Sequence, residues 1–148
     1  NKWDLIKEKD ANTARRGEQE LRSKAPFLEW VKFVYLSAET GLRVHQLPEE
    51  ILEVAAARER RIATAEVNKV LEALVQHSNP PQKPGHEVKL LYASQVGTAP
   101  PVFAVVCSRP DDIPESYERY LINGFRKAWS FEGSPLRLKF KRRSGRNP

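Results

Sequence analysis

Residues 88–107 read VKLLYASQVGTAPPVFAVVC and form the centre of the fold that we predict. The mostly apolar run at 88–92 predicts a strand, and the glycine- and proline-containing segment 97–101 predicts a turn. The run at 102–107 is apolar throughout, which is typical of a strand that is buried on both faces. We therefore predict that residues 102–107 form the central strand of a sheet.

A helix is predicted ahead of these strands, starting near Thr64. Thr64 is a suitable N-cap, and Glu66 falls in the first turn, where the helix dipole favours a carboxylate. Prolines and a glycine within residues 80–85 end this helix and form a rigid loop. The predicted apolar face consists of residues at helical spacing, namely Val67, Val70, Leu71, Leu74 and Val75.

A second helix is predicted after the central strand. Pro114 fits its first turn, where a missing backbone N–H costs nothing, and the Gly-Ser-Pro segment at 133–135 ends it. Asp111 and Asp112 then mark the start of a helix better than they mark a catalytic pair. The apolar positions of this helix again recur at helical spacing and are Tyr117, Tyr120, Leu121, Phe125 and Ala128. Tyr117 and Tyr120 are expected in the core and at its boundary.

The last predicted strand alternates between two kinds of side chain. Leu136, Leu138 and Phe140 share one face, and Arg137, Lys139 and Lys141 share the other. Residues 63–148 therefore read helix, strand, strand, helix, strand. We predict an α+β fold in which two helices pack on one face of a three-stranded sheet.

Residues 1–62 carry a different signal, which starts with Asn-Lys-Trp-Asp at 1–4. NKxD is the guanine-reading motif of GTPases. The carboxylate of Asp4 can accept both neighbouring donors of guanine, a pair that adenine cannot supply. Asn1 would bond the base edge and brace the loop, and the stem of Lys2 would cover the ring.

Ser37 and Ala38 reinforce this interpretation. They follow the apolar run 31–36, a predicted buried strand, and match the GTPase loop whose backbone N–H meets guanine O6. Helices are predicted at 10–24 and 43–61, which completes the order typical of the last third of an α/β P-loop GTPase domain. We therefore predict that residues 1–62 are the end of such a domain, followed by a second domain at 63–148.

Several kinds of chemistry are not supported by the sequence. The seven glycines allow no GxxxxGK[ST] loop to hold phosphates, so the chain alone should not hydrolyse GTP, and we expect no catalytic residues. No histidine pairs with Cys107 at a metal-binding spacing, and we expect this cysteine to be a small buried apolar residue. We expect no membrane span, and a single cysteine fits the reducing cytoplasm. The start at Asn1 without methionine suggests a fragment.

Positive charge is concentrated in the second half of the chain. Of the net charge of +6, residues 1–62 contribute +1 (12 basic, 11 acidic) and residues 63–148 contribute +5 (13 basic, 8 acidic). Such an excess fits either contact with a nucleic acid or a solubilising tail. The candidate RNA contacts are the basic residues near the end, namely Arg137, Lys139, Lys141, Arg142, Arg143 and Arg146.

Nearly the whole chain resembles the C-terminal portion of the Der (EngA) family, bacterial GTPases with two G domains followed by a KH-like domain. The resemblance rests on NKWD at 1–4, SAETG at 37–41, RIATAEVNKVLEALV at 61–75, KLLYASQVGTAPPVF at 89–103 and PESYERYLINGFRKAWSFEGSPLRLKFKRR at 114–143. It implies a role in large ribosomal subunit assembly driven by GTP, with Mg²⁺, in the full-length protein. It also implies guanine recognition by Asn1, Lys2, Asp4, Ser37 and Ala38.

The resemblance leaves two roles open for the KH-like domain. Ordinary KH domains clamp RNA with a GxxG loop, and no two glycines of this chain are three residues apart. Contact with ribosomal RNA would instead depend on basic side chains of strand 137–141 and tail 142–146, and would be sensitive to salt. Alternatively, the domain is a regulatory protein–protein module that packs against the protein's own G domains and reports their nucleotide state.

Overall fold

The computed structural model describes residues 1–26, 29–82 and 87–143. Contacts within the chain divide it into two compact units. The first unit comprises Asn1–Ala57 and Glu132–Ser134, and the second comprises Arg58–Phe131 and Pro135–Pro148. Among the described residues, no helix combines the length and the apolar character that crossing a membrane requires.

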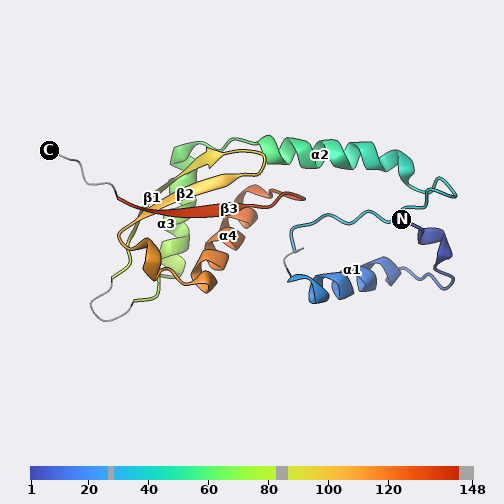
Figure 1. Cartoon of the computed structure of the whole chain (residues 1–148), viewed down its shortest axis with the longest axis horizontal. Coiled ribbons are helices and arrows are strands. Elements are labelled where there is room, and N and C mark those ends of the chain that lie inside the picture. Colours follow the sequence, from blue (N-terminus) through green and yellow to red (C-terminus); the bar gives the residue numbers. More distant parts are fainter. Residues whose placement is uncertain (27–28, 83–86, 144–148) are drawn as a thin grey trace. The chain divides into compact units, whose positions relative to one another are not determined.

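The second unit contains the predicted order of helices and strands (Figure 1). Strand β2 lies in the middle of the sheet, pairing with β1 in antiparallel and with β3 in parallel orientation. The apolar run that we expected at the centre of the sheet is thus confirmed there. The elements are α3 (Thr64–His77), β1 (Leu90–Gly97), β2 (Val102–Cys107), the 3-10 turn η4 (Pro110–Asp112), α4 (Glu115–Trp129) and β3 (Arg137–Arg142).

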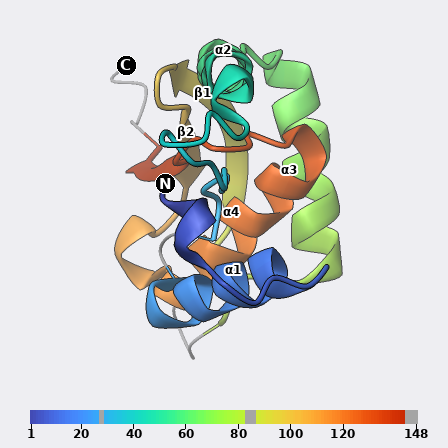
Figure 2. The ribbon, with the colours of Figure 1, turned by 90° about the vertical axis from the view of Figure 1, so that its right-hand side faces the viewer.

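Helices α3 and α4 pack on the same face of this sheet, as Figure 2 shows. An aromatic cluster packs between α4 and the sheet. The ring of Phe103 on β2 lies 5.1 Å from that of Phe125 and stacks on Trp129 at 5.6 Å, nearly parallel. Phe131 closes the cluster, with its ring 6.0 Å from that of Phe103. Burial of these large rings and of the surrounding aliphatic side chains is the main force that holds the two layers together.

Several expected boundaries in the second unit are wrong by one or more residues. The N-cap of α3 is Ala63, whose carbonyl accepts the Val67 N–H at 3.0 Å, and no side chain caps this helix. Thr64 is therefore the first helical residue. Strand β1 extends beyond the predicted 88–92 because β2 offers pairing partners as far as Gly97.

Helix α4 differs from the prediction at both ends. Pro114 immediately precedes it, and the Pro114 carbonyl accepts the first helical hydrogen bond at 2.9 Å. The helix ends at Trp129, before the predicted stop at 133–135, because Ser130 adopts a left-handed conformation with φ 45°. Ala128, which we predicted on the apolar face, is exposed, and Trp129 is buried in the core instead. Trp129 lies one turn beyond Phe125, so it continues the buried stripe.

The first unit is helical, with an extended segment between its helices. The predicted strand at 31–36 is wrong: these residues are extended and partly buried but belong to no sheet. A strand needs a neighbour to complete its hydrogen bonds, and no described residue of this unit forms one. The elements are η1 (Trp3–Leu5), α1 (Thr13–Lys24), η3 (Val44–Gln46) and α2 (Leu47–Glu59), so the predicted helix at 43–61 starts with a 3-10 turn and ends early.

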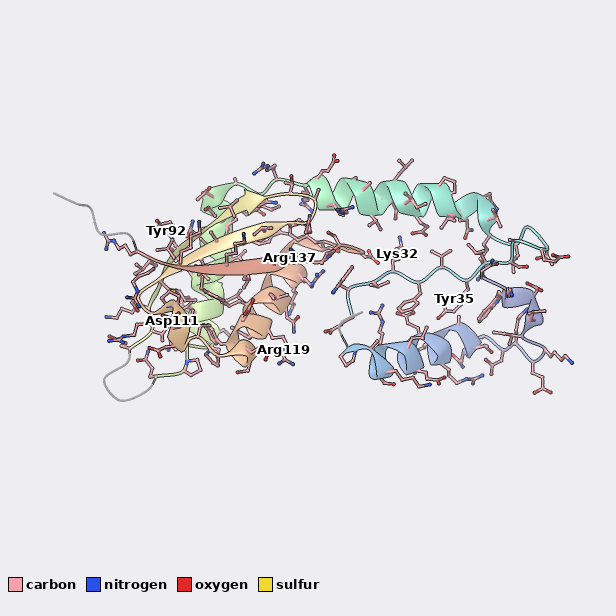
Figure 3. The ribbon with its side chains drawn as sticks, in the orientation of Figure 1. Lys32, Tyr35, Tyr92, Asp111, Arg119 and Arg137 are labelled. Carbon is pink, nitrogen blue, oxygen red and sulfur yellow. The ribbon has the colours of Figure 1, made fainter. Side chains whose placement is uncertain are left out.

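Polar contacts tie the extended segment to these helices. Tyr35, labelled in Figure 3, donates from its hydroxyl to the Ala14 carbonyl of α1 at 3.0 Å. Lys32 pairs with Glu53 of α2 at 2.7 Å and also with Glu50. No apolar residue among the described part of this unit is fully buried, and several large ones are exposed, including Leu52 at 69% and Ile51 at 57%. The first unit therefore rests on polar contacts rather than on a core of its own.

Candidate functional site

The two predicted guanine-reading segments lie together in the first unit. The side-chain oxygen Oδ1 of Asn1 accepts the backbone N–H of Ala38 at 3.1 Å and that of Lys2 at 2.7 Å. The Ser37 hydroxyl donates to Oδ1 of Asp4. Residues 33 to 37 positions apart in sequence thus converge, and the brace that we expected from Asn1 is present in the structure.

Ser37 is the residue through which this site is organised. It is fully buried, its backbone N–H donates to the Leu42 carbonyl at 3.1 Å, and its hydroxyl accepts from the Thr40 N–H at 3.3 Å. The hydrogen bond from Ser37 is also the main reason why the pKa of Asp4 lies below its ordinary value. Asp4 is therefore an ionised acceptor at neutral pH, with capacity for further donors. The sequence motif predicts a role for the backbone of this loop and none for the serine hydroxyl.

The remaining residues of the motif support the loop. The Trp3 N–H donates to the Leu36 carbonyl at 3.1 Å, and the rings of Trp3 and Tyr35 are 4.6 Å apart. Lys2 has a left-handed backbone, with φ 61° and ψ 32°, which turns the chain between Asn1 and Trp3. Trp3 thus attaches the loop to the extended segment that precedes Ser37 through one backbone hydrogen bond and one ring contact.

The second candidate site lies on β3. Leu138 is buried and Phe140 packs against the core, so the residues that alternate with them lie on the opposite, open face of the sheet. Arg137, Lys139 and Lys141 are all exposed there. The predicted alternation is therefore confirmed.

The other basic candidates are not part of this row. Arg142 falls on the opposite side of the strand and lies 3.6 Å from Asp111 of the η4 turn. Arg143 follows the end of β3 and is exposed, and Arg146 lies outside the described residues. The structure thus separates three side chains that share one face from Arg142, whose charge is partly balanced by a carboxylate.

Strand register identifies the neighbours of the three cations. Val106 of β2 pairs with Lys141 on one side and with Tyr92 of β1 on the other, while Ala104 pairs with Lys139 and Ser94 in the same way. Tyr92 is 51% exposed. The sequence pattern predicts Tyr92 only as a strand residue, and the burial of the adjacent Ala93 places it on the open face.

Other groups with reactive potential are structural. Cys107 is buried, and burial raises the pKa of its thiol, as expected for a small core residue. The hydroxyls of Tyr117 and Tyr120 on α4 donate to the carbonyls of Ser78 and Leu74 at 2.8 Å each, so both rings belong to the core and its boundary. Residues 1–26, 29–82 and 87–143 contain no group of three or more potential metal ligands.

The second unit, with two helices on one face of a three-stranded mixed sheet, is a KH-like domain. The chain belongs to the family described as KH-domain-like of EngA bacterial GTPase enzymes, C-terminal, whose model matches residues 61–141.

Curated relatives extend this similarity over both units. The chain is 44% identical to GTPase Der of Gemmatimonas aurantiaca, 40% identical to GTPase Der of Trichlorobacter lovleyi and 38% identical to GTPase Der of Fusobacterium nucleatum. Each comparison covers 97% of the chain and 32–33% of the relative. The chain thus spans about a third of the length of the curated relatives it matches.

Proposed function

We propose that this chain acts within a cytoplasmic GTPase that assembles the large ribosomal subunit. In this proposal residues 1–62 are the end of a G domain and residues 63–148 are a KH-like domain that contacts ribosomal RNA. The observation that supports the proposed RNA contact is the row of exposed cations on β3, namely Arg137, Lys139 and Lys141. Arg142, Arg143 and Arg146 would add charge beside this row.

Charge on the open face favours an anionic partner for a simple reason. Each lysine or arginine that neutralises a phosphate releases a counterion. The logarithm of the binding constant therefore falls linearly with the logarithm of the salt concentration. The KH-like domain lacks a GxxG loop, so the backbone clamp of ordinary KH domains is absent and side-chain charge must supply the contact.

Charge reversal tests this role. Lys139→Glu and Lys141→Glu together should weaken binding of the chain to large-subunit ribosomal RNA and reduce the salt slope by about 2, one for each phosphate contact. A matched control is the reversal of Lys127, an exposed cation on α4, away from the open face. Unchanged affinity and salt slope in the β3 variant would refute the RNA role of this surface.

For the first unit we propose recognition of guanine in GTP, bound with Mg²⁺ in the full-length protein. Asp4 would accept the two neighbouring donors of the base, Asn1 and Lys2 would contact its edge and face, and the Ala38 N–H would meet its O6. The ionised state of Asp4 supports this assignment. The Ala38 N–H donates to Asn1 Oδ1 in the structure, so it would exchange this acceptor for guanine O6 when the base binds. Phosphate-binding segments are not among these residues, so the chain alone should show no tight binding of fluorescent GTP.

A substitution at Asp4 tests the guanine assignment in the longer protein. Asp4→Asn replaces one acceptor with a donor, which suits the 2-carbonyl of xanthine and not the 2-amino group of guanine. We expect GTP affinity to fall and xanthosine triphosphate affinity to rise. If the variant prefers GTP over xanthosine triphosphate as strongly as the wild type does, the assignment is contradicted.

The lack of a GxxG loop favours a second candidate role, that of a regulatory module. The KH-like domain would then contact the protein's own G domains and report their nucleotide state, without touching RNA. Small-angle X-ray scattering of the full-length protein with GTP and with GDP would detect the change in domain arrangement that this role requires. An identical profile in both states would speak against it.

A further inference from the structure

The open face of the sheet combines three strands with three different kinds of side chain. Strand β3 supplies the cations, β2 supplies small apolar residues, and β1 supplies an exposed aromatic ring. None of the residues named below carries a carboxylate. Tyr92 and Arg137, on the two outer strands, are labelled in Figure 3. Its members are Tyr92, Ser94, Ala104, Val106, Arg137, Lys139 and Lys141, and we call this set the open-face platform.

Alternation places each of these residues on the face away from the helices. Ala93 and Val105 belong to the hydrophobic core, so the residues on either side of them point the other way. Tyr92, next to Ala93, is 51% exposed, whereas Ala104 and Val106 have low exposure, at 5% and 8%. On this face, the middle strand therefore presents small apolar side chains between the aromatic ring of β1 and the row of cations on β3.

The spacing of the platform matches the two parts of a nucleotide. Tyr92 and Lys141 flank Val106 on opposite strands, and neighbouring strands lie about 4.8 Å apart, so their backbones are about 10 Å apart. A base that stacks on Tyr92 would leave its phosphate within reach of the flexible Lys141 side chain. Successive cations on one face of β3 are about 7 Å apart and could follow a phosphate backbone.

We infer that the open-face platform binds single-stranded RNA, with Tyr92 as a stacking surface for a base and the cations of β3 as phosphate contacts. This inference rests on the proposed RNA contact and specifies its ligand. Proteins that bind single strands combine a positive track with aromatic side chains on which bases stack. In a duplex the bases are already stacked inside the helix, so Tyr92 would have no base to contact.

Fluorescence anisotropy with the 148-residue chain tests the inference. The probes are a labelled ten-nucleotide RNA of mixed sequence without self-complementarity and a ten-base-pair RNA duplex. We expect tighter binding to the single strand. Loss of one stacked base corresponds to a loss of about 5- to 150-fold in affinity, so Tyr92→Ala should weaken single-strand binding by that factor. Tyr92→Phe should retain the affinity.

The control is Leu91→Ala, which removes an exposed apolar side chain from the same strand next to the platform. We expect it to leave single-strand affinity unchanged. Photo-cross-linking of wild-type chain to RNA containing 4-thiouridine should attach RNA to the peptide that carries Tyr92. This measurement needs no variant and stays decisive if Tyr92→Ala does not fold.

Each contrary result has a distinct meaning. Unchanged affinity of Tyr92→Ala, with weakened binding by Lys139→Glu and Lys141→Glu, would overturn the platform and leave the proposed RNA contact intact. Duplex affinity equal to single-strand affinity would also overturn the platform. Absence of salt-sensitive RNA binding would overturn both. Self-association of the chain that Tyr92→Ala abolishes, seen by light scattering, would make this face a contact between two copies.

Discussion

Asn68 of α3 replaces a neighbouring strand at the edge of β1, and its removal should destabilise the second unit strongly. Its Nδ2 donates to the Ala93 carbonyl at 2.9 Å, and its Oδ1 accepts the Ala93 N–H at 2.9 Å. Both backbone groups of Ala93 are thereby satisfied on the side of β1 that faces away from β2. We predict that Asn68→Ala lowers the free energy of unfolding by about 2–5 kcal/mol.

The magnitude follows from the burial of Ala93, which is completely inaccessible to solvent. Each buried polar group left without a partner costs about 1–3 kcal/mol, so two such groups cost about 2–6 kcal/mol. Alanine has a better helix propensity than asparagine, which offsets about 0.5 kcal/mol. The remainder is a large part of the 5–15 kcal/mol that stabilises a typical domain.

Urea denaturation followed by far-UV circular dichroism measures this loss. With an m-value of about 2 kcal/mol per M, the unfolding midpoint should fall by about 1–2.5 M. Asn68→Asp keeps the acceptor for the Ala93 N–H but sets a carboxylate oxygen against the Ala93 carbonyl, so it should also lower the midpoint. The matched control is Asn123→Ala, the same substitution at an exposed position of α4. A midpoint for Asn68→Ala equal to that of the control would refute the reasoning.

Two further predictions concern ionisable groups. Ser37→Ala removes the hydrogen bond that lowers the pKa of Asp4, so this pKa should rise toward its ordinary 3.8, which carboxyl ¹³C NMR measures. The control is Ser23→Ala at an exposed position, and an unchanged pKa of Asp4 in Ser37→Ala would show that the hydrogen bond is not the cause of the shift. Because the pKa of Asp4 is lowered on folding, the stability that it contributes is present above about pH 4 and is lost as the pH falls through the lowered value. Burial raises the pKa of Tyr117 from 10.0 to about 12, so its contribution is present below pH 10 and is lost between pH 10 and 12. Tyr117→Phe should cost about 0.5–1.5 kcal/mol at pH 7, because the bond to Ser78 is lost, and should show less alkaline loss in urea titrations at pH 9 and 11; equal alkaline loss would exclude Tyr117 as its source.

The second unit was largely predictable because its elements carry strong local patterns. Alternation at 136–141 reflects one buried and one exposed face, and the apolar run 102–107 reflects the central strand, whose side chains are largely buried. Its ends were less predictable. The extension of β1 to Gly97 depends on pairing with β2, and the end of α4 depends on the left-handed conformation of Ser130, neither of which a local pattern specifies.

The first unit shows where local patterns fail. Residues 31–36 have the composition of a buried strand, yet they form none, because a strand is completed by hydrogen bonds to a neighbour. For the candidate site in the same unit, the sequence indicated which residues converge but not all of the hydrogen bonds between them. Asn1 and Ala38 were expected to act together, whereas the hydroxyl of Ser37 on Asp4 appears only once the two segments are folded against each other.

By itself, the sequence determined the types of element, their order in the KH-like domain and the concentration of positive charge near the end of the chain. These properties depend on the spacing of apolar and charged residues, which local geometry converts into helices and strands. Tertiary structure alone decided which residues become neighbours. Strand register placed Tyr92 across Val106 from Lys141, separated Arg142 from the row of cations and seated Asn68 on Ala93, because pairing between distant segments is set by packing of the whole unit.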